Sequence, residues 1–124
     1  MQKFFLLSGT ILSALSVAIG AFGAHALKDI LLKNNRMEVF ETAFKYQFFH
    51  ALGLLIIGIL LLHTQNAWIR YAGISMMVGI VIFSGSLYIL SLSNVGFWGA
   101  ITPLGGLAFI LAWVFLAIGI YKGF

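Results

Sequence analysis

The sequence contains a run of 51 residues, between Arg70 and Lys122, without a single Asp, Glu, Lys or Arg. One helix of that length would reach roughly 75 Å at 1.5 Å per residue, far beyond the roughly 30 Å of a bilayer's hydrocarbon core. The run must therefore cross a membrane, turn and cross again. Its only turn-like segment is Ser93-Asn94-Val95-Gly96, which combines polar residues with a flexible Gly.

Two further uncharged stretches, residues 4–27 and 46–69, precede this run, so we expect four membrane helices. The predicted fold is an all-α, integral membrane four-helix bundle that forms a single membrane domain over residues 1–124. We place its helices at about residues 4–27, 46–62, 70–92 and 99–121. The composition agrees, because only 8% of the residues are charged, against about 25% in soluble domains.

The charged residues are few and lie in loops or at predicted helix ends. A net charge of +4 spread in this way suits contact with anionic lipid head groups. It does not form the dense basic face that nucleic-acid binding requires, so we expect no nucleic-acid partner. The chain has no Cys, which excludes disulfides, thiolate chemistry and Cys-based metal or iron–sulfur sites.

The N-terminal segment has some features of a cleavable signal peptide: Lys3, an apolar run, and the A-x-A pattern Ala24-His25-Ala26. Its apolar run of about 20 residues exceeds the 7–15 of a signal peptide's apolar region. Its small residues are also spaced for helix packing. We therefore expect an uncleaved membrane helix.

Small residues recur at spacings of three and four along the first predicted helix and so share one face, which lets a neighbouring backbone approach closely. These residues are Gly9, Ser13, Ser16, Gly20 and Gly23. We expect this face to pack inside the molecule; a dimer interface or a cavity lining is the alternative. Three further glycines are predicted packing positions in the later helices: Gly85, Gly105 and Gly106.

Residues 28–45 form the one polar segment and contain every acidic residue of the chain: Asp29, Glu38 and Glu41. We predict a polar loop here that is broken at Asn34-Asn35. From Met37 onward its apolar residues follow helical spacing, which predicts a short amphipathic segment at the membrane surface that runs into the second membrane helix. A solvated helical connector is the alternative.

The predicted topology brings several polar side chains into one leaflet, because the first and third helices end on the side where the second and fourth begin. An ionisable group in a membrane segment is a candidate functional residue, since its desolvation must be offset by a partner. We expect His25 and His50 to contact each other or to share one polar partner. The candidate polar cluster comprises His25, Tyr46, Gln47, His50, Ser84, Tyr88 and Thr102.

Other chemistry has little support in the sequence. Two His without a nearby carboxylate make a poor zinc site, which takes four ligands or three plus water. No Gly-rich loop with a Lys suits phosphates, and no Ser lies near a plausible His–Asp pair. We therefore expect no metal, no cofactor and no catalytic residue, and we predict that the protein is not an enzyme. A structural role for the two His, as hydrogen-bonded neutral side chains, is the simplest interpretation.

Four motifs in series resemble a known family. They are Gly20-Ala21-Phe22-Gly23-Ala24-His25, Tyr46-Gln47-x-x-His50-Ala51-Leu52, Phe83-Ser84-Gly85-Ser86-Leu87-Tyr88 and Thr102-Pro103-x-Gly105-Gly106. The chain resembles the small bacterial membrane proteins called domain of unknown function 423, and is similar to transmembrane protein 256 of eukaryotes. The resemblance covers all four helices and implies a multi-pass protein of the bacterial inner or plasma membrane. It brings no established activity, cofactor or catalytic residue.

Two functions remain open at this stage. The first is a structural or partner-binding component of the cell membrane, serving envelope integrity or the assembly of a complex. The second is a minimal oligomeric transporter or channel that uses the His-containing cluster. The expected partners are the lipid bilayer and either a second copy of the chain or a larger membrane protein.

The orientation in the membrane rests on a small difference in positive charge. Four Lys or Arg residues lie on the side of the polar segment and three lie on the side of both termini. Because cytoplasmic loops carry the excess of positive residues, we predict that residues 28–45 are cytoplasmic and that both termini lie outside.

Overall fold

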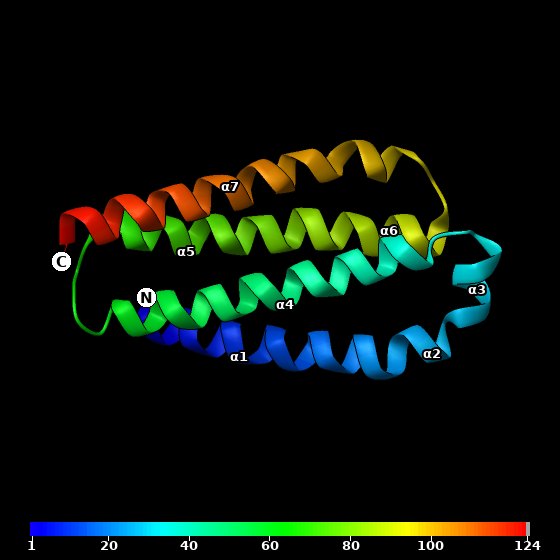
Figure 1. Cartoon of the computed structure of the whole chain (residues 1–124), viewed down its shortest axis with the longest axis horizontal. Helices are drawn as coiled ribbons and strands as arrows, with labels where there is room; N and C mark the ends of the chain where they lie inside the picture. Colours follow the sequence, from blue (N-terminus) through cyan, green and yellow to red (C-terminus); the bar gives the residue numbers. More distant parts are fainter. Residues whose placement is uncertain (124) are drawn as a thin grey trace.

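The computed structural model describes residues 1–123, which are mostly helical and contain no strand. Four helices are long and apolar enough to cross a membrane, as the sequence predicts: Gln2–Ala26, Met37–Leu60, Ala67–Ser93 and Phe97–Gly123. The chain is therefore an all-α membrane protein with four spanning helices (Figure 1).

Two of the four spans contain a short π-helical turn. The first span consists of α1 (Gln2–Ala18), the π-helix η1 (Ile19–Gly23) and α2 (Ala24–Ala26). The third consists of α5 (Ala67–Gly79), the π-helix η2 (Ile80–Ser84) and α6 (Gly85–Ser93). The second span is α4 (Met37–Leu60) and the fourth is α7 (Phe97–Gly123), while the short α3 (Lys28–Lys33) connects α2 to α4.

Most of the polar segment 28–45 is helical, so its description as a loop is wrong. The predicted break at Asn34-Asn35 and the predicted helical segment from Met37 into the second membrane helix are both present. Residues 28–33 form α3, which lies across the end of the bundle (Figure 1). Residues 37–45 are the first nine residues of α4, which continues without a break into the membrane. The charged residues of this part are tolerated because a helix can extend into the head-group region, where their side chains reach water.

The four spans pack as two antiparallel hairpins. α1 lies along α4, and α7 lies along α5, η2 and α6. α4 also contacts α5, η2 and α6, and so joins the hairpins. Both chain ends and the connection 61–66 lie at one end of the molecule, and α3 and the connection 94–96 lie at the other (Figure 1).

The main core lies between α4, α5 and α7 and is built from aliphatic side chains and two Phe rings. Phe5 reaches it from α1, where it packs against the Gly73 backbone of α5. The buried members are Phe5, Leu54, Ile57, Leu61, Ile69, Ala72, Met76, Ile80, Phe109, Ala112 and Leu116. α1 buries the smallest share of its surface among the four spans, so most of it faces the surroundings of the bundle.

Only part of the predicted packing set makes close helix contacts. A Cβ at Gly9 would lie 2.9 Å from the Ala51 carbonyl oxygen, and one at Gly20 would lie 3.0 Å from the Phe44 ring. A Cβ at Gly105 would overlap the Phe83 backbone of η2. These three glycines therefore set the spacing between helices.

At the three other predicted packing glycines a Cβ would fit, so helix packing does not require a glycine there. Nothing lies within 4 Å of a Cβ built at Gly85, and the contacts at Gly23 and Gly106 are at ordinary van der Waals distance. Among the predicted serines, Ser16 is buried and its hydroxyl donates to the Leu12 carbonyl at 2.9 Å. The Ser13 hydroxyl is buried without a hydrogen-bond partner in residues 1–123.

Asparagines organise the helix ends. The Asn66 side chain accepts from the Trp68 amide at 2.8 Å and caps α5. Asn35 and Asn94 both adopt positive φ, near 56° and 57°, at the turns that follow α3 and α6. Asn tolerates this left-handed conformation better than other residues with a side chain, which explains the use of Asn at both turns.

Candidate functional site

The centre of the candidate site lies near the middle of the spans, deeper than the sequence suggests. Because α4 begins at Met37, His50 is roughly 20 Å from its start and about 15 Å from its end. Trp113 of α7 lies at a similar distance, about 15 Å, from the corresponding end of α7. An imidazole at this depth needs partners inside the protein.

His50 obtains both partners from its surroundings. Its side chain is only 7% exposed. Its Nδ1 lies 2.8 Å from the Tyr46 carbonyl oxygen, one turn earlier in α4. The Trp113 indole N–H donates to Nε2 at 3.0 Å. Since an indole N–H can only donate, Nε2 is the acceptor, and Nδ1 carries the proton and donates to the carbonyl. The geometry therefore holds a neutral imidazole in one tautomer.

Aromatic rings enclose the same imidazole. The Phe109 ring stacks on it with centroids 3.5 Å apart and planes 11° from parallel. The Trp113 ring lies 5.7 Å away between centroids. Tyr46, which is 42% exposed, lies 6.3 Å from the imidazole and stacks on Phe83 of η2. These rings tie α4 to α7 and η2 and leave little room for a ligand at His50.

A second hydrogen-bonded unit links three spans through Gln47. The Gln47 amide donates to the Leu12 carbonyl of α1 at 3.0 Å. Its amide oxygen accepts from the Tyr88 hydroxyl of α6 at 2.6 Å. Gln47 is buried, so both bonds form out of contact with the bilayer. One side chain of α4 thereby connects the first span to the third.

Serine and threonine hydroxyls of the predicted cluster and its neighbours form further contacts between spans. The Ser84 hydroxyl is buried and donates to the Ala43 carbonyl of α4 at 2.8 Å. The Ser86 and Thr102 hydroxyls lie 2.6 Å apart and join α6 to α7. The predicted cluster is thus three separate units, centred on Gln47, on His50 and on the Ser86–Thr102 pair, with Ser84 as an additional link.

The predicted His25–His50 contact is wrong. His50 uses both ring nitrogens on Tyr46 and Trp113, whereas His25 lies exposed in α2. His25 faces a surface hollow that Met37 and Glu41 also line, and it forms none of the hydrogen bonds found within residues 1–123. The two side chains therefore belong to different sites.

Both π-helical turns fall on motifs that the sequence highlights. η1 contains the Gly20-Ala21-Phe22-Gly23 part of the first motif, and η2 ends with Phe83-Ser84 of the third. Single π-turns are rare inside α-helices and often occur at functional sites. Here η2 brings Ser84 to the α4 backbone and the Phe83 backbone against Gly105 of α7.

Trp113 is the site residue that the sequence did not reveal. Membrane Trp residues concentrate at the interfaces, where their N–H meets polar head groups. Trp113 lies near the middle of α7 instead, far from the head groups. This position in the sequence is the one sign that its indole N–H needs an acceptor inside the protein. No group of three or more His, Asp or Glu side chains suited to a metal ion occurs in the part of the chain that the structure describes.

Comparison with known proteins identifies the family. Residues 19–106 match the family model described as "Protein of unknown function (DUF423)". The chain belongs to the DUF423 family. The matched region extends from η1 through Gly106 of α7 and so includes all four motifs and both π-helical turns.

Relatives of the DUF423 protein occur in several bacteria and match it almost end to end. It is 45% identical to the UPF0382 membrane protein SH2409 of Staphylococcus haemolyticus over 121 residues, or 98% of either chain. It is 41% identical to the UPF0382 membrane protein YwdK of Bacillus subtilis over 98% of either chain. It is 34% identical to the UPF0382 inner membrane protein YgdD of Escherichia coli K12, over 95% of this chain and 89% of YgdD. No solved structure matches the chain.

Proposed function

We propose that this protein is a structural or partner-binding component of the cell membrane that serves envelope integrity or the assembly of a larger complex. One observation carries the proposal: the buried polar side chains bond to neighbouring spans. Gln47 joins α1 to α6, and His50 accepts from Trp113 of α7. Ser84 donates to the backbone of α4. These groups hold helices together.

This use of polar groups argues against a pathway through a single copy of the chain. Transport sites combine buried charges or free polar groups with broken helices or a wet cavity. His50 is instead stacked and bonded on both nitrogens, and the pronounced hollows lie on the outer surface of the bundle. The same considerations lead us to propose that the protein is not an enzyme.

An oligomeric transporter or channel is the second candidate. The position of His50 near mid-span favours it, because an ionisable group at this depth commonly marks a route for protons or ions. The π-helical turns are a second feature in its favour, since such turns often accompany function. In this case a path would form between copies of the chain.

The location in the cell membrane is also part of the proposal. The four spans support a multi-pass membrane protein, and the Escherichia coli relative is named an inner membrane protein. We therefore assign this chain to the inner or plasma membrane of a bacterium, with lipid and a second membrane protein, or a further copy of the chain, as its partners.

Reconstitution in vesicles separates the two candidates. Purified protein would be placed in vesicles that contain a pH-sensitive dye, and an imposed pH or potassium gradient would be followed with and without protein. A structural component should leave the decay of the gradient as slow as in protein-free vesicles. A faster decay that disappears in the His50→Leu variant would reject the structural role and support the transporter.

A second experiment tests for a partner. Membranes that contain the protein at its natural level would be extracted in mild detergent and separated by size, and the co-migrating chains would be quantified by mass spectrometry. We expect a larger membrane protein in fixed ratio to this chain. A homo-oligomer alone, together with gradient decay in vesicles, would favour the second candidate.

A further inference from the structure

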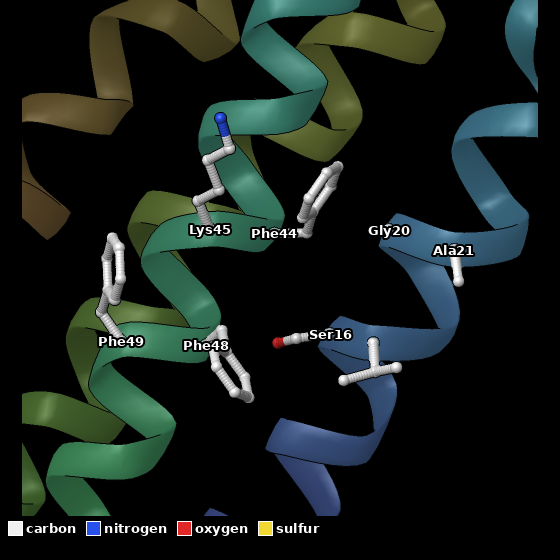
Figure 2. Close-up of a pocket in the computed structure, with 8 residues that line it drawn as sticks. Ser16, Gly20, Ala21, Phe44, Lys45, Phe48 and Phe49 are labelled. Carbon is white, nitrogen blue, oxygen red and sulfur yellow. The ribbon is translucent and has the colours of Figure 1, made fainter.

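An apolar groove opens on the outer surface of the first hairpin, between η1 and α4. It has a volume of about 300 Å³. Gly20 and Ala21 form one wall, and Phe44, Phe48 and Phe49 of α4 also line the groove. The Phe44 and Phe48 rings point towards the first span, whereas the Phe49 ring lies farther round α4 (Figure 2). Gly20 has no side chain and Ala21 has only a methyl group, so η1 does not fill the groove in front of the Phe rings. The one close contact is between Gly20 and the Phe44 ring. An elongated apolar ligand would find aromatic contacts on one wall and little obstruction on the other.

A second hollow continues the groove towards the end of the bundle where α3 lies. Its volume is about 410 Å³, and it shares Gly20 and Ala21 with the apolar groove. Its other lining residues include His25, Lys28 and Glu41. The two hollows therefore adjoin, and together they form a surface depression that is apolar at one end and polar at the other.

The polarity changes in the direction expected for a membrane lipid. The polar hollow is lined by residues near the end of α2 and the start of α4, at the level of the lipid head groups. The apolar groove reaches inward to Val17 and Phe49. Lys45 lies at its edge, and Figure 2 shows its side chain extending along α4 towards the start of that helix. This direction takes its ammonium group to the head-group level, as lysines near helix ends commonly do.

We propose that this depression is a binding site for an anionic glycerophospholipid, with one acyl chain against Phe44, Phe48 and Phe49 and the phosphate near Lys28 and Lys45. Two lysines against one carboxylate give the polar end a net positive charge, which matches a lipid with one negative charge. Basic pockets between membrane helices commonly bind such head groups. The Glu41 carboxylate accepts a hydrogen bond from a head-group hydroxyl, such as those of phosphatidylglycerol, that extends beyond the phosphate.

The site is independent of the polar units inside the bundle. Gln47 and His50 point into the bundle and bond to other spans, whereas the groove lies on the outer face formed by η1 and α4. The proposed lipid therefore occupies the outer surface of the first hairpin and contacts both of its helices. Because α1 buries so little surface in the bundle, a lipid held between η1 and α4 would strengthen its attachment.

The test compares lipid retention by native mass spectrometry. The full chain in detergent would be incubated with phosphatidylglycerol, phosphatidylcholine or phosphatidylethanolamine of identical acyl chains, and bound lipids would be counted. Soluble glycerol phosphate tests whether the head group alone suffices. We expect phosphatidylglycerol to be retained best and glycerol phosphate not to bind. Replacing Lys28 or Lys45 by Gln should weaken phosphatidylglycerol retention about five-fold for each lysine.

Matched variants separate the site from general effects of charge and folding. Lys33→Gln removes a cation from the same end of the molecule but outside the depression, and should retain the lipid as the wild type does. Ala21→Leu fills the groove and should reduce retention, whereas Ala18→Leu, at an exposed position outside the groove, should not. All variants should melt like the wild type in lipid-free detergent.

Three results would overturn the proposal. One is equal retention of the three lipids by the wild type. Another is a loss in Lys33→Gln as large as in Lys28→Gln and Lys45→Gln. The third is unchanged binding in Ala21→Leu, which would leave the head-group charges without an acyl-chain site. None of these results depends on whether the protein transports a solute, so the lipid site and the proposed function fail or succeed separately.

Discussion

At the scale of single residues, the hydrogen bond between Trp113 and His50 is the contact that most constrains the interior. Replacing Trp113 by Phe keeps an aromatic ring but leaves His50 Nε2 without its donor. Hydrogen bonds between membrane helices contribute about 0.6 kcal/mol on average and up to roughly 1.7 kcal/mol. We expect Trp113→Phe to decrease the unfolding free energy by an amount within that range. Circular dichroism during detergent-induced unfolding measures this decrease.

Trp98→Phe is the matched control, because the Trp98 ring packs against the buried cluster of Ala43, Leu87 and Leu90 but its indole N–H forms none of the hydrogen bonds found within residues 1–123. It removes the same ring surface without removing a hydrogen bond. A cycle with His50→Leu isolates the bond. Either single change leaves one polar group without its partner within the span, the His50 Nε2 or the Trp113 indole N–H. The double variant should therefore lose less stability than the sum of the two. Strict additivity would mean that the bond contributes nothing.

The residues of this site illustrate what a sequence can and cannot predict. The types of polar residue inside the bundle were predicted, since Gln47, His50, Ser84 and Tyr88 all form bonds between or within spans. Their partners were not, because depth along a helix leaves its rotation about its own axis undetermined. His25 and His50 lie on helices that pack together, yet the first faces a surface hollow and the second faces α7.

At the scale of helices, α7 approaches the backbone of η2 closely at Gly105. A Cβ at Gly105 would overlap the Phe83 backbone, which cannot move without shifting the π-helical turn. Gly105→Ala should therefore lower the unfolding free energy by about 1–3 kcal/mol. Gly85→Ala is the control, since its backbone is helical and nothing lies within 4 Å of the added carbon.

Gly85→Ala should leave the protein as stable as the wild type or stabilise it by up to about 1 kcal/mol, because Ala favours a helix more than Gly does. Thermal and detergent melts of both variants measure the contrast. Similar destabilisation by the two changes would mean that helix propensity, and not the approach of α7 to η2, dominates at these positions.

The packing of the first span onto α4 gives a third prediction. Gly20→Leu should displace Phe44 and lower the melting temperature in detergent, because even a Cβ would lie 3.0 Å from that ring. Gly23→Leu should cost less, since its nearest neighbour beyond its own helix is the end of the Phe40 ring at 3.8 Å. Val17→Leu, at a position 58% exposed, should be nearly neutral. An equal loss in Val17→Leu and Gly20→Leu would contradict this assignment of the packing face.

The helices themselves were largely predictable because uncharged runs of sufficient length leave few alternatives in a membrane. The predicted helical segment from Met37 that runs into the second membrane helix is present, since α4 begins at Met37. The membrane helix itself was placed only from about residue 46, because charged residues precede it, whereas charged side chains can extend from one continuous helix into the head-group layer. The fourth membrane helix was placed from about residue 99, whereas α7 begins at Phe97, so Pro103 lies in its second turn. The two π-helical turns have no signature in the sequence that propensity or periodicity would detect.

At the scale of the whole molecule, the two ends of the bundle differ in charge and in shape. The difference in positive charge predicts which end faces the cytoplasm. α3 and the start of α4 hold every acidic residue together with four Lys or Arg. The opposite end holds both termini, the connection 61–66 and the remaining three Lys or Arg. The count of positive residues favours placing α3 in the cytoplasm. The lipid site would then lie in the inner leaflet.

Single cysteines test this orientation, since the chain contains no Cys of its own. Asn34 and Asn66 are unsuitable positions, because Asn34 bonds to the Ser91 carbonyl and Asn66 caps α5. Asp29→Cys in α3 and Gln65→Cys in the connection 61–66 replace exposed side chains without removing a positive charge. A membrane-impermeant maleimide should label Gln65→Cys in intact cells and Asp29→Cys only after permeabilisation.

The opposite pattern would reverse the orientation and move the lipid site to the outer leaflet. Labelling of both positions in intact cells would mean either that α4 does not cross the membrane or that the chain inserts in both orientations, because α4 is the one span between the two positions.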